Sequence, residues 1–185
     1  PRRVDSRRCI SYLKIEHRGM LPAERRESLG EWVFGCDVCQ QVCPWNQRFP
    51  QPRCDPDFAP RSPLPHPQAG ALLGLSPQEF NNSFRGTALK RAKRVGLLRN
   101  AVVALGNTGK ITAIPHLERA LCTDPDAVVR GHAAWALALC NADAAQSVLR
   151  AALESETDPL VLVEIEAALV AWDSVRESAS PKAVE

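Results

Sequence analysis

The sequence has no run of 18 apolar residues and no apolar signal region behind its first residue, Pro1. A membrane-spanning helix needs about 20 consecutive apolar residues, and a secretory signal needs an apolar core after its basic start. Both absences predict a cytoplasmic protein without a membrane partner. The chain also lacks an initiator Met, so we expect it to be part of a longer protein.

The usual residue patterns of hydrolytic and nucleotide-binding sites are absent as well. The sequence shows no Ser-His-Asp or paired-carboxylate arrangement and no glycine-rich phosphate loop. His116 and His132 have no second metal ligand at a useful spacing. We therefore assign no catalytic residue within this chain and look for its chemistry among the cysteines.

Seven cysteines are present, and an odd number argues against a disulfide framework in a chain without a secretion signal. Three of them lie in the stretch Gly35-Cys36-Asp37-Val38-Cys39-Gln40-Gln41-Val42-Cys43-Pro44, and Cys9 precedes this stretch. Cys54 falls in a proline-rich stretch and is interpreted as a bystander. Cys122 and Cys140 fall among apolar helical residues and are predicted to be core thiols.

The spacing C-x2-C-x3-C-P is typical of iron–sulfur ligation, in which several thiolates converge on one small cluster. In two-cluster ferredoxins the cysteine before the proline binds the other cluster, so we expect a partner motif outside this chain. Zinc is the rival, because four thiolates also make a tetrahedral structural site. Zinc sites usually have two separated C-x2-C pairs, and only one pair is present here. The pattern thus favours iron–sulfur ligation by Cys9, Cys36, Cys39 and Cys43 over zinc or unligated thiols.

The second half of the chain repeats. Residues 99–105 align with residues 131–137 at an offset of 32, and Asp124-Pro125 recurs as Asp158-Pro159 at an offset of 34. A repeating helix pair of this length is typical of a helical solenoid and resembles HEAT-like repeats. We expect a first helix over residues 111–121 and a second over 128–139. Asp should cap the second helix with Pro in its first turn, and small alanines should let neighbouring helices approach closely.

These patterns predict a mostly α-helical protein. A ferredoxin-like, cysteine-ligated cluster segment at residues 1–49 precedes a short HEAT-like α-helical repeat domain at residues 71–175. Residues 50–70 form a connector with seven prolines among its first 18 residues, because proline neither continues a helix nor serves a central strand. Residues 176–185 are expected to be a disordered tail.

Charge is unevenly distributed along the chain. Residues 1–99 carry 17 Lys or Arg against 9 Asp or Glu, whereas residues 100–185 carry 6 against 12. A basic half can attract polyanions or can simply be solvated surface. Residues 84–99 contain six cations and no acid, and their spacing predicts a helix with an apolar edge and a basic face, built from Leu89, Lys90, Lys93, Arg94 and Leu97. Such a face could neutralise phosphates.

Three motifs together resemble epoxyqueuosine reductase: Arg7-Arg8-Cys9-Ile10-Ser11-Tyr12-Leu13, the stretch from Gly35 to Asn46, and Leu97-Leu98-Arg99-Asn100-Ala101. The resemblance covers residues 2–140. That family reduces epoxyqueuosine to queuosine at the wobble position of certain tRNAs, and it uses cobalamin and two 4Fe-4S clusters. The resemblance implies that this chain is the C-terminal part of such an enzyme. The corrinoid-binding domain, its proposed acid and the first cysteine run are not in this sequence.

Carried over to this sequence, the family pattern places Cys9, Cys36 and Cys39 on one cluster and Cys43 on the other. The remaining ligands would lie in the missing part, so we expect the fragment alone to be inactive. The pattern also implies that Ser11 and Asp37 approach cobalamin. Together with the charge distribution, it predicts tRNA contacts from a set of basic residues: Lys14, His17, Arg18, Arg85, Lys90, Arg91, Lys93, Arg94 and Arg99.

We therefore expect part of a monomeric oxidoreductase that passes electrons singly to a corrinoid and docks tRNA. The sequence does not indicate the electron donor. Two other functions stay open. The chain could be a ferredoxin-like electron-transfer protein fused to a HEAT-repeat interaction module without an RNA partner. It could also be a non-enzymatic HEAT-type module whose cysteines hold zinc or nothing.

Overall fold

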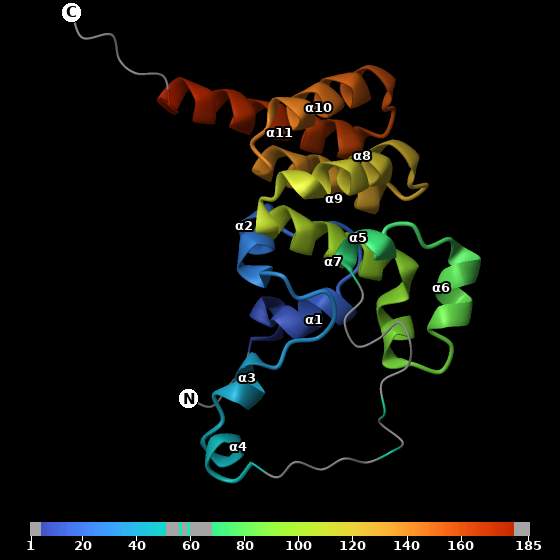
Figure 1. Cartoon of the computed structure of the whole chain (residues 1–185), viewed down its shortest axis with the longest axis vertical. Helices are drawn as coiled ribbons and strands as arrows, with labels where there is room; N and C mark the ends of the chain where they lie inside the picture. The colour runs from blue at the N-terminus through green and yellow to red at the C-terminus, as the bar shows by residue number, and fades with distance from the viewer. Residues whose placement is uncertain (1–4, 51–55, 57–58, 60–67, 180–185) are drawn as a thin grey trace, which may run out of the picture.

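The computed structural model describes residues 5–50, 56, 59 and 68–179. Within them the chain is helical and forms no β-strand (Figure 1), which confirms the predicted mostly α fold. The N-terminal segment contains only short helices: η1 (Ser6–Arg8), α1 (Ile10–Ile15), α2 (Ala23–Arg26), η2 (Glu27–Leu29), α3 (Val38–Gln41) and α4 (Pro44–Arg48).

The second part of the chain contains the longer helices together with further short ones. They are α5 (Ala69–Leu72), α6 (Pro77–Ser83), η4 (Ala88–Ala92), α7 (Lys93–Thr108), η5 (Ile111–Ala113), α8 (Ile114–Thr123), α9 (Ala127–Leu139), α10 (Asp143–Ser155) and α11 (Pro159–Ala179). Most of the predicted connector, with Cys54, lies outside the described residues. The predicted tail is wrong for residues 176–179, because α11 continues through them, and residues 180–185 lie outside the described part.

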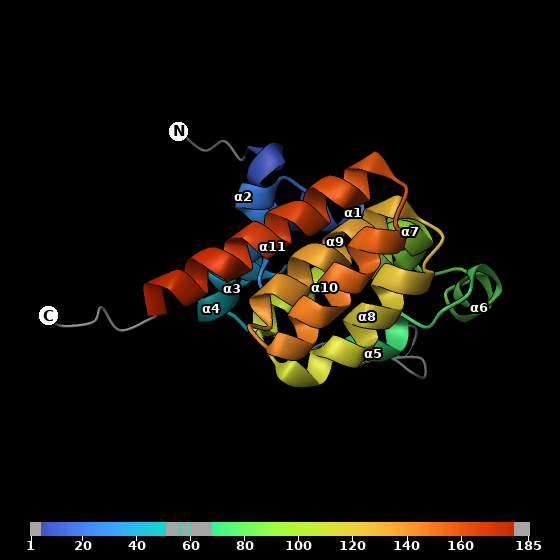
Figure 2. The ribbon, with the colours of Figure 1, turned by 90° about the horizontal axis from the view of Figure 1, so that it is seen from above.

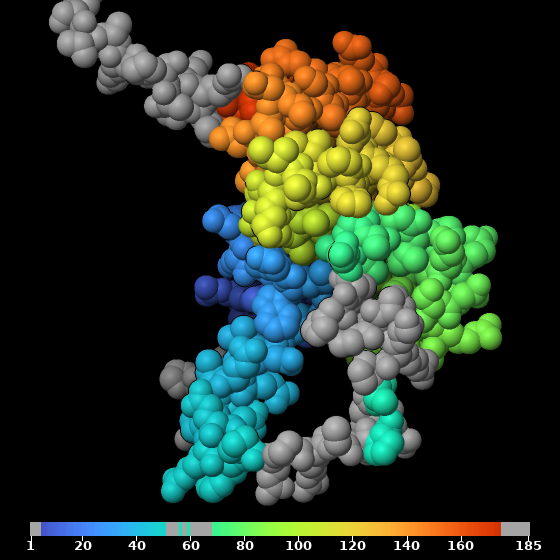
Figure 3. Space-filling view, viewed as in Figure 1, coloured from blue at the N-terminus to red at the C-terminus, as the bar shows by residue number. Residues whose placement is uncertain are grey.

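The helices stack in two layers (Figures 1 and 2). Helices α7, α9 and α11 lie side by side in one layer, and α5, α8 and α10 pack against them in the other. The N-terminal segment packs against α7, and its α3–α4 part projects from the end of the stack farthest from the C-terminus (Figure 3). The cysteine motif is therefore carried on the edge of the helical stack.

A constant 32-residue register relates the three helices of the first layer. Each repeat places side chains that are at most 4 % exposed at equivalent positions: Leu97, Ala101 and Ala104 in α7, Val129, Ala133 and Ala136 in α9, and Val161, Ile165 and Ala168 in α11. The predicted offset of 32 is confirmed. The offset of 34 inferred from the two Asp-Pro pairs is wrong, because those pairs do not occupy equivalent positions.

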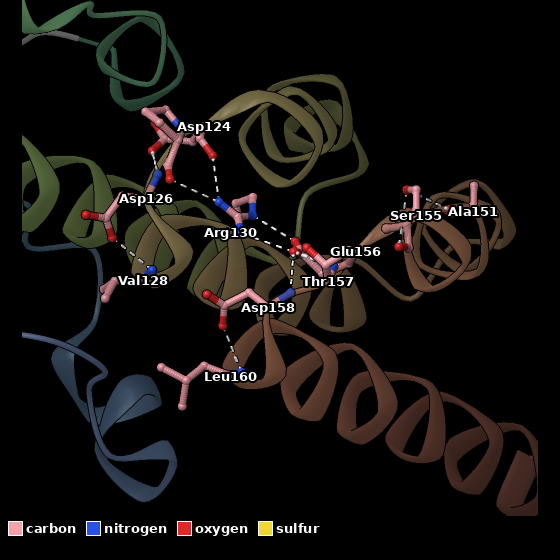
Figure 4. Close-up of polar contacts among 12 residues, drawn as sticks. Asp124, Asp126, Val128, Arg130, Ala151, Ser155, Glu156, Thr157, Asp158 and Leu160 are labelled. Carbon is pink, nitrogen blue, oxygen red and sulfur yellow. Dashed lines mark hydrogen bonds and ion pairs between the residues drawn. The ribbon is translucent and has the colours of Figure 1, made fainter.

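The helix caps show why the Asp-Pro pairs mislead. Asp158 Oδ1 accepts the N–H of Leu160 at 2.9 Å, so Asp158 caps α11 as predicted. The cap of α9 is Asp126, whose Oδ1 accepts the N–H of Val128 at 2.9 Å (Figure 4). Asp124 lies two residues earlier and accepts the N–H of Asp126 instead, so the prediction that it caps the helix is wrong.

Two arginines tie neighbouring repeats together. Arg94 at the start of α7 binds Asp124 in the α8–α9 loop at 2.7 Å. Arg130 of α9 binds both carboxylate oxygens of Glu156 in the α10–α11 loop, at 2.7 and 3.1 Å (Figure 4). The hydrogen bond from Arg130 lowers the pKa of Glu156 to about 2. All four side chains are mostly buried, so these ion pairs help to fix the spacing of the repeats.

The predicted basic helix is interrupted. Leu89 and Lys90 lie on η4, and α7 begins only at Lys93, whose φ of 60° turns the chain out of the right-handed helical region. Lys90 and Leu97 therefore do not share one continuous helix face. Lys90 and Arg91 lie on η4, and Lys93 is the first residue of α7.

Close packing of α7 on α9 confirms the prediction from the small residues. A Cβ added to Gly106 would lie 2.8 Å from the Cβ of Ala136. Glycine and alanine at this crossing let the two helix backbones meet directly. Within the described residues, no helix combines the length and apolar character that crossing a membrane would take.

Candidate iron–sulfur site

The cysteine motif folds as two short helices joined by a tight turn. Cys36 follows Gly35, whose φ of 71° favours glycine, and Cys39 lies in α3. Cys43 is the residue before α4, and Pro44 opens that helix, where a missing N–H costs nothing. Two side-chain amides of α4 hold the turn: Asn46 Nδ2 donates to Gln40 O at 3.0 Å, and Gln47 Nε2 donates to Gln41 O at 2.8 Å.

The fourth candidate ligand, Cys9, is the N-cap of α1. Cys9, Cys36 and Cys43 are half-buried thiols, Cys39 is exposed, and none forms a disulfide. Free thiols of this number are the donor set that iron–sulfur clusters take, one thiolate to each iron. In the described part of the chain, no three His, Cys, Asp or Glu side chains are placed to hold a single metal ion. The assignment of the four cysteines as cluster ligands therefore stays a prediction.

An apolar surface surrounds the motif. Val38, Val42, Trp45 and Phe49 are all exposed, Trp45 by 72 %, and the rings of Trp45 and Phe49 stack at 5.5 Å. Helices α3 and α4 therefore present large apolar side chains to solvent within the described chain.

The segments that carry Cys9 and Cys36 are fastened to α7 by two buried side chains. Arg99 donates to three backbone carbonyls of the N-terminal segment, Leu13 O, His17 O and Gly19 O, at 2.9–3.0 Å. Asn100 Nδ2 donates to Lys14 O at 2.7 Å and to Val33 O at 2.9 Å. Arg99 also donates to Asn100 Oδ1, so the two side chains act as one hydrogen-bonded pair.

Helices α9 and α11 add two further polar contacts to the same segment. The N–H of Leu21 donates to His132 Nε2 at 3.2 Å, which leaves Nδ1–H to donate to Val128 O at 2.7 Å. Burial lowers the pKa of His132 to about 3, so the ring is neutral. Arg26 binds both carboxylate oxygens of Glu164, at 2.5 and 2.7 Å.

A second amide of α7, Asn107, holds the turn around η2. Its Nδ2 donates to Arg26 O at 3.0 Å and to Gly30 O at 2.8 Å. Asn107 follows Asn100 by seven residues, which is two turns along the same face of α7. The spacing of the two asparagines is the only sequence signal for the side chains that hold the N-terminal segment. No sequence signal points to Glu164.

Two sequence profiles match the chain. A "4Fe-4S double cluster binding domain" covers residues 1–46, and "HEAT repeats" cover residues 85–170. The first contains all four candidate cysteines, and the second contains α7 to α10 with the start of α11. The two parts predicted from the sequence thus correspond to two known families.

Curated epoxyqueuosine reductases match most of this chain. An epoxyqueuosine reductase of Pseudomonas aeruginosa is 44 % identical over 137 residues, which are 74 % of this chain and 38 % of the relative. That of Bacillus subtilis is 36 % identical over 171 residues, which are 90 % and 42 %. A crystal structure of epoxyqueuosine reductase with an epoxyqueuosine-modified tRNA-Tyr stem loop matches with a TM-score of 0.85 and 33 % identity, over 94 % of this chain and 46 % of that one.

In sequence and in fold, this chain is similar to epoxyqueuosine reductases. The chain spans about two fifths of the length of the curated epoxyqueuosine reductases it matches. The similarity confirms the predicted resemblance, and the cluster profile supports iron–sulfur clusters as cofactors.

Five of the basic residues predicted from the epoxyqueuosine reductase resemblance are exposed. They are Arg18, Arg85, Lys90, Arg91 and Lys93, which we call the cation patch. Arg18 Nη2 donates to Arg91 O at 2.7 Å, so the N-terminal segment and η4 adjoin in this patch. Arg91 also pairs with Glu16, and Lys90 bonds Asn81.

Of the other four predicted tRNA contacts, two are buried and two are half-buried. Lys14 is 0 % exposed and Arg99 is 1 % exposed, so the prediction that they touch tRNA is wrong. Burial and the nearby charge of Arg18 lower the pKa of Arg99 to about 10. The Arg94 guanidinium donates to Leu75 O and forms the ion pair with the α8–α9 loop. His17 Nε2 bonds Met20 O at 2.8 Å.

The residues that the resemblance places near cobalamin lie on the two cysteine-bearing segments. Ser11 is half-buried on α1, and Asp37 is exposed at the start of α3. Cavities of 310 and 230 Å³ are lined by other residues, so neither cavity places Ser11 or Asp37 against a corrinoid. Their assignment stays a prediction.

The two cysteines of the repeat domain differ. Cys140 is buried at the end of α9, as predicted for a core thiol. Cys122 is exposed on α8, so its prediction as a core thiol is wrong. Its position near the end of α8 leaves its side chain outside the buried stripe of Leu117, Ala120 and Leu121.

Proposed function

We propose that this chain is the C-terminal part of a cobalamin-dependent, iron–sulfur epoxyqueuosine reductase that converts epoxyqueuosine to queuosine in tRNA. The observation that carries the proposal is the order of its two parts. A cysteine segment that matches a double-cluster profile is clamped onto a HEAT-type stack, and the combination matches an epoxyqueuosine reductase with a TM-score of 0.85.

In this proposal Cys9, Cys36 and Cys39 hold one 4Fe-4S cluster, and Cys43 completes a second. The donor chemistry fits, since all four are free thiols. Hydrogen bonds from α7 reach the segment of Cys9 and the segment that leads to Cys36. Bound clusters supply one-electron transfer, and the corrinoid supplies the bond chemistry on the modified base. The chain's own residues hold the ligands in place, and the remaining ligands belong to the part of the enzyme outside this sequence.

The cation patch is the proposed tRNA surface. Three of its members fall between Lys90 and Lys93, and Arg18 joins them through its bond to Arg91 O. Exposed cations bind phosphates and release counterions, so affinity should fall steeply as salt rises. The crystal structure with a bound tRNA stem loop supports RNA as the partner of such a fold.

The reductase assignment is tested on the complete enzyme with epoxyqueuosine-containing tRNA. Cys36→Ala should abolish turnover and reduce the iron bound per protein, whereas Cys122→Ala, an exposed cysteine outside the motif, should leave both unchanged. Full turnover in Cys36→Ala would contradict the ligand assignment.

A gel shift with tRNA separates the proposal from a ferredoxin-like carrier fused to a HEAT-repeat interaction module. Binding that weakens with salt, and that weakens further when Lys90 and Arg91 are both changed to Ala, supports the reductase. Complete absence of RNA binding by the enzyme would favour the carrier. Failure of anaerobically reconstituted enzyme to bind iron and sulfide would favour the zinc or empty-site module.

A further inference from the structure

One amide joins the two chain segments that carry Cys9 and Cys36. Asn100 is 0 % exposed on α7, and its two N–H groups are both used, one on Lys14 O and one on Val33 O. Its Oδ1 accepts two N–H groups from Arg99. Every hydrogen-bonding position of the side chain is occupied, so its orientation is fixed.

The two carbonyls that Asn100 binds are close to the cysteines along the chain. Lys14 lies in α1, a helix of six residues whose N-cap is Cys9. The last carbonyls of a helix lack partners within it, and Arg99 and Asn100 supply them for Leu13 O and Lys14 O. Val33 precedes Cys36 by three residues, a span of at most about 11 Å in extended chain. The amide therefore sets the separation of a rigid cysteine-bearing helix from the chain segment that leads to Cys36.

We infer that Asn100 is a positioning residue for the candidate cluster, because its amide fixes the spacing between Cys9 and Cys36. The inference rests on the proposed function, in which both cysteines ligate one cluster. Ligand spacing and the hydrogen bonds behind the ligands tune how tightly a metal centre is held and at what potential it is reduced. In this way a side chain of the repeat domain, bonded to both cysteine-bearing segments, acts on the redox centre.

Asn107 provides a matched control on the same helix face. Its Nδ2 also donates to backbone carbonyls of the N-terminal segment, but those carbonyls belong to Arg26 and Gly30, in a turn that carries no cysteine. Loss of either amide removes comparable support from the fold. Only loss of Asn100 also removes the side chain that is bonded to both cysteine-bearing segments.

The test compares Asn100→Asp with Asn107→Asp in the complete, anaerobically purified enzyme. Aspartate keeps the volume of asparagine but cannot donate a hydrogen bond. At position 100 it gains an ion pair with Arg99, which offsets part of the loss, whereas the buried Oδ1 of Asn107 accepts no hydrogen bond from the described residues. Asn107→Asp should therefore cost the fold at least as much stability as Asn100→Asp.

Two readouts report on the cluster rather than on activity. Iron release to a chelator should be about 10-fold faster in Asn100→Asp, the size typical of lost support behind a metal ligand, and the potential and EPR signal of one cluster should change. In Asn107→Asp both clusters should behave as in the parent enzyme. Equal iron release in the two variants, or equal changes in both clusters, would overturn the inference.

If Asn100→Asp fails to fold, Asn100→Ser replaces it, because serine keeps one hydrogen-bond donor and adds no charge. Asn100→Ser should change iron release and the signal of the same cluster in the same direction, by a smaller amount. If the parent enzyme binds clusters and the change at Asn100 alters neither of them, only the positioning role is refuted. A parent enzyme that binds no cluster at all refutes the proposed function together with it.

Discussion

Lys14 should destabilise the folded chain, and replacing it by Met should stabilise it. The side chain is 0 % exposed and its Nζ has no hydrogen-bond partner among the described residues. Burial, with the nearby charge of Arg99, lowers the pKa of Lys14 from 10.5 to about 7. Each pKa unit corresponds to about 1.4 kcal/mol, so the charged amine costs the folded state up to about 5 kcal/mol. Met has a similar length and no charge.

The sign of the pH dependence follows from the lowered pKa. Between pH 7 and 10.5 the unfolded chain keeps the Lys14 proton while the folded chain has lost it, so stability rises with pH in this window. Below pH 7 both states are protonated and the full cost is present. The advantage of Lys14→Met should therefore be largest at pH 7 and shrink by about 1.4 kcal/mol per pH unit up to pH 10.5.

Urea unfolding of the parent chain and of Lys14→Met, measured from pH 7 to 10.5, tests this expectation. Groups other than Lys14 titrate in both proteins and cancel in the difference. Lys90→Met, on the exposed cation patch, is the control and should change stability little at any pH. Parallel stability curves for the parent and Lys14→Met would refute the burial of an unpaired amine at this position. They would also reopen the possibility that Lys14 contacts tRNA.

Three further positions give sharp expectations. The pKa of His132 is lowered from 6.5 to about 3. As pH drops through this window, the parent chain should therefore lose about 1.4 kcal/mol of stability per pH unit relative to His132→Gln. Acid unfolding of both proteins, followed by circular dichroism, measures the difference. Gly106→Ala should cost about 1–3 kcal/mol through overpacking on α9. Gly131→Ala should be near neutral in thermal unfolding, because its Cβ would meet side chains alone, the flexible end of Met20 at 3.0 Å and Glu164 Cγ at 3.4 Å. Glu156→Gln should cost about 2–3 kcal/mol at pH 7, because the ion pair with Arg130 lowers the pKa of Glu156 from 4.5 to about 2; the difference in urea unfolding should vanish as pH falls from 4.5 to 2.

The fold could be predicted from local patterns because a helical solenoid is built from local contacts. Alanines and apolar residues at an offset of 32 identified the repeating helices, and they are the buried positions of α7 and α9. The Asp-Pro pairs gave the wrong offset, since Asp126 rather than Asp124 caps its helix. A cap depends on backbone geometry of one turn, and two aspartates spaced by two residues are equally plausible from sequence alone.

The cysteines of the candidate site could be predicted from the sequence. The α7 side chains that hold the cysteine-bearing segments in place could not. Thiolate spacing is set by ligand chemistry and is visible in the sequence. Charge alone cannot distinguish a cation that binds phosphate from one that binds backbone carbonyls, and Arg99 proved to be of the second kind. The asparagine beside it, Asn100, has no charge, and its only sequence signal is the seven-residue spacing to Asn107. Both roles depend on which segment packs against α7, which is tertiary information.

Polar residues in the first layer of the stack link the two predicted domains. Arg99, Asn100 and Asn107 of α7, with His132 of α9 and Glu164 of α11, all bond to the N-terminal segment. That segment has only short helices, so many of its backbone carbonyls lack partners within it, and a buried carbonyl without a partner is costly. Because the stack supplies those partners, the segment that carries Cys9 and Cys36 takes its shape from the repeats. The cysteine segment and the repeat stack should therefore fold as one unit.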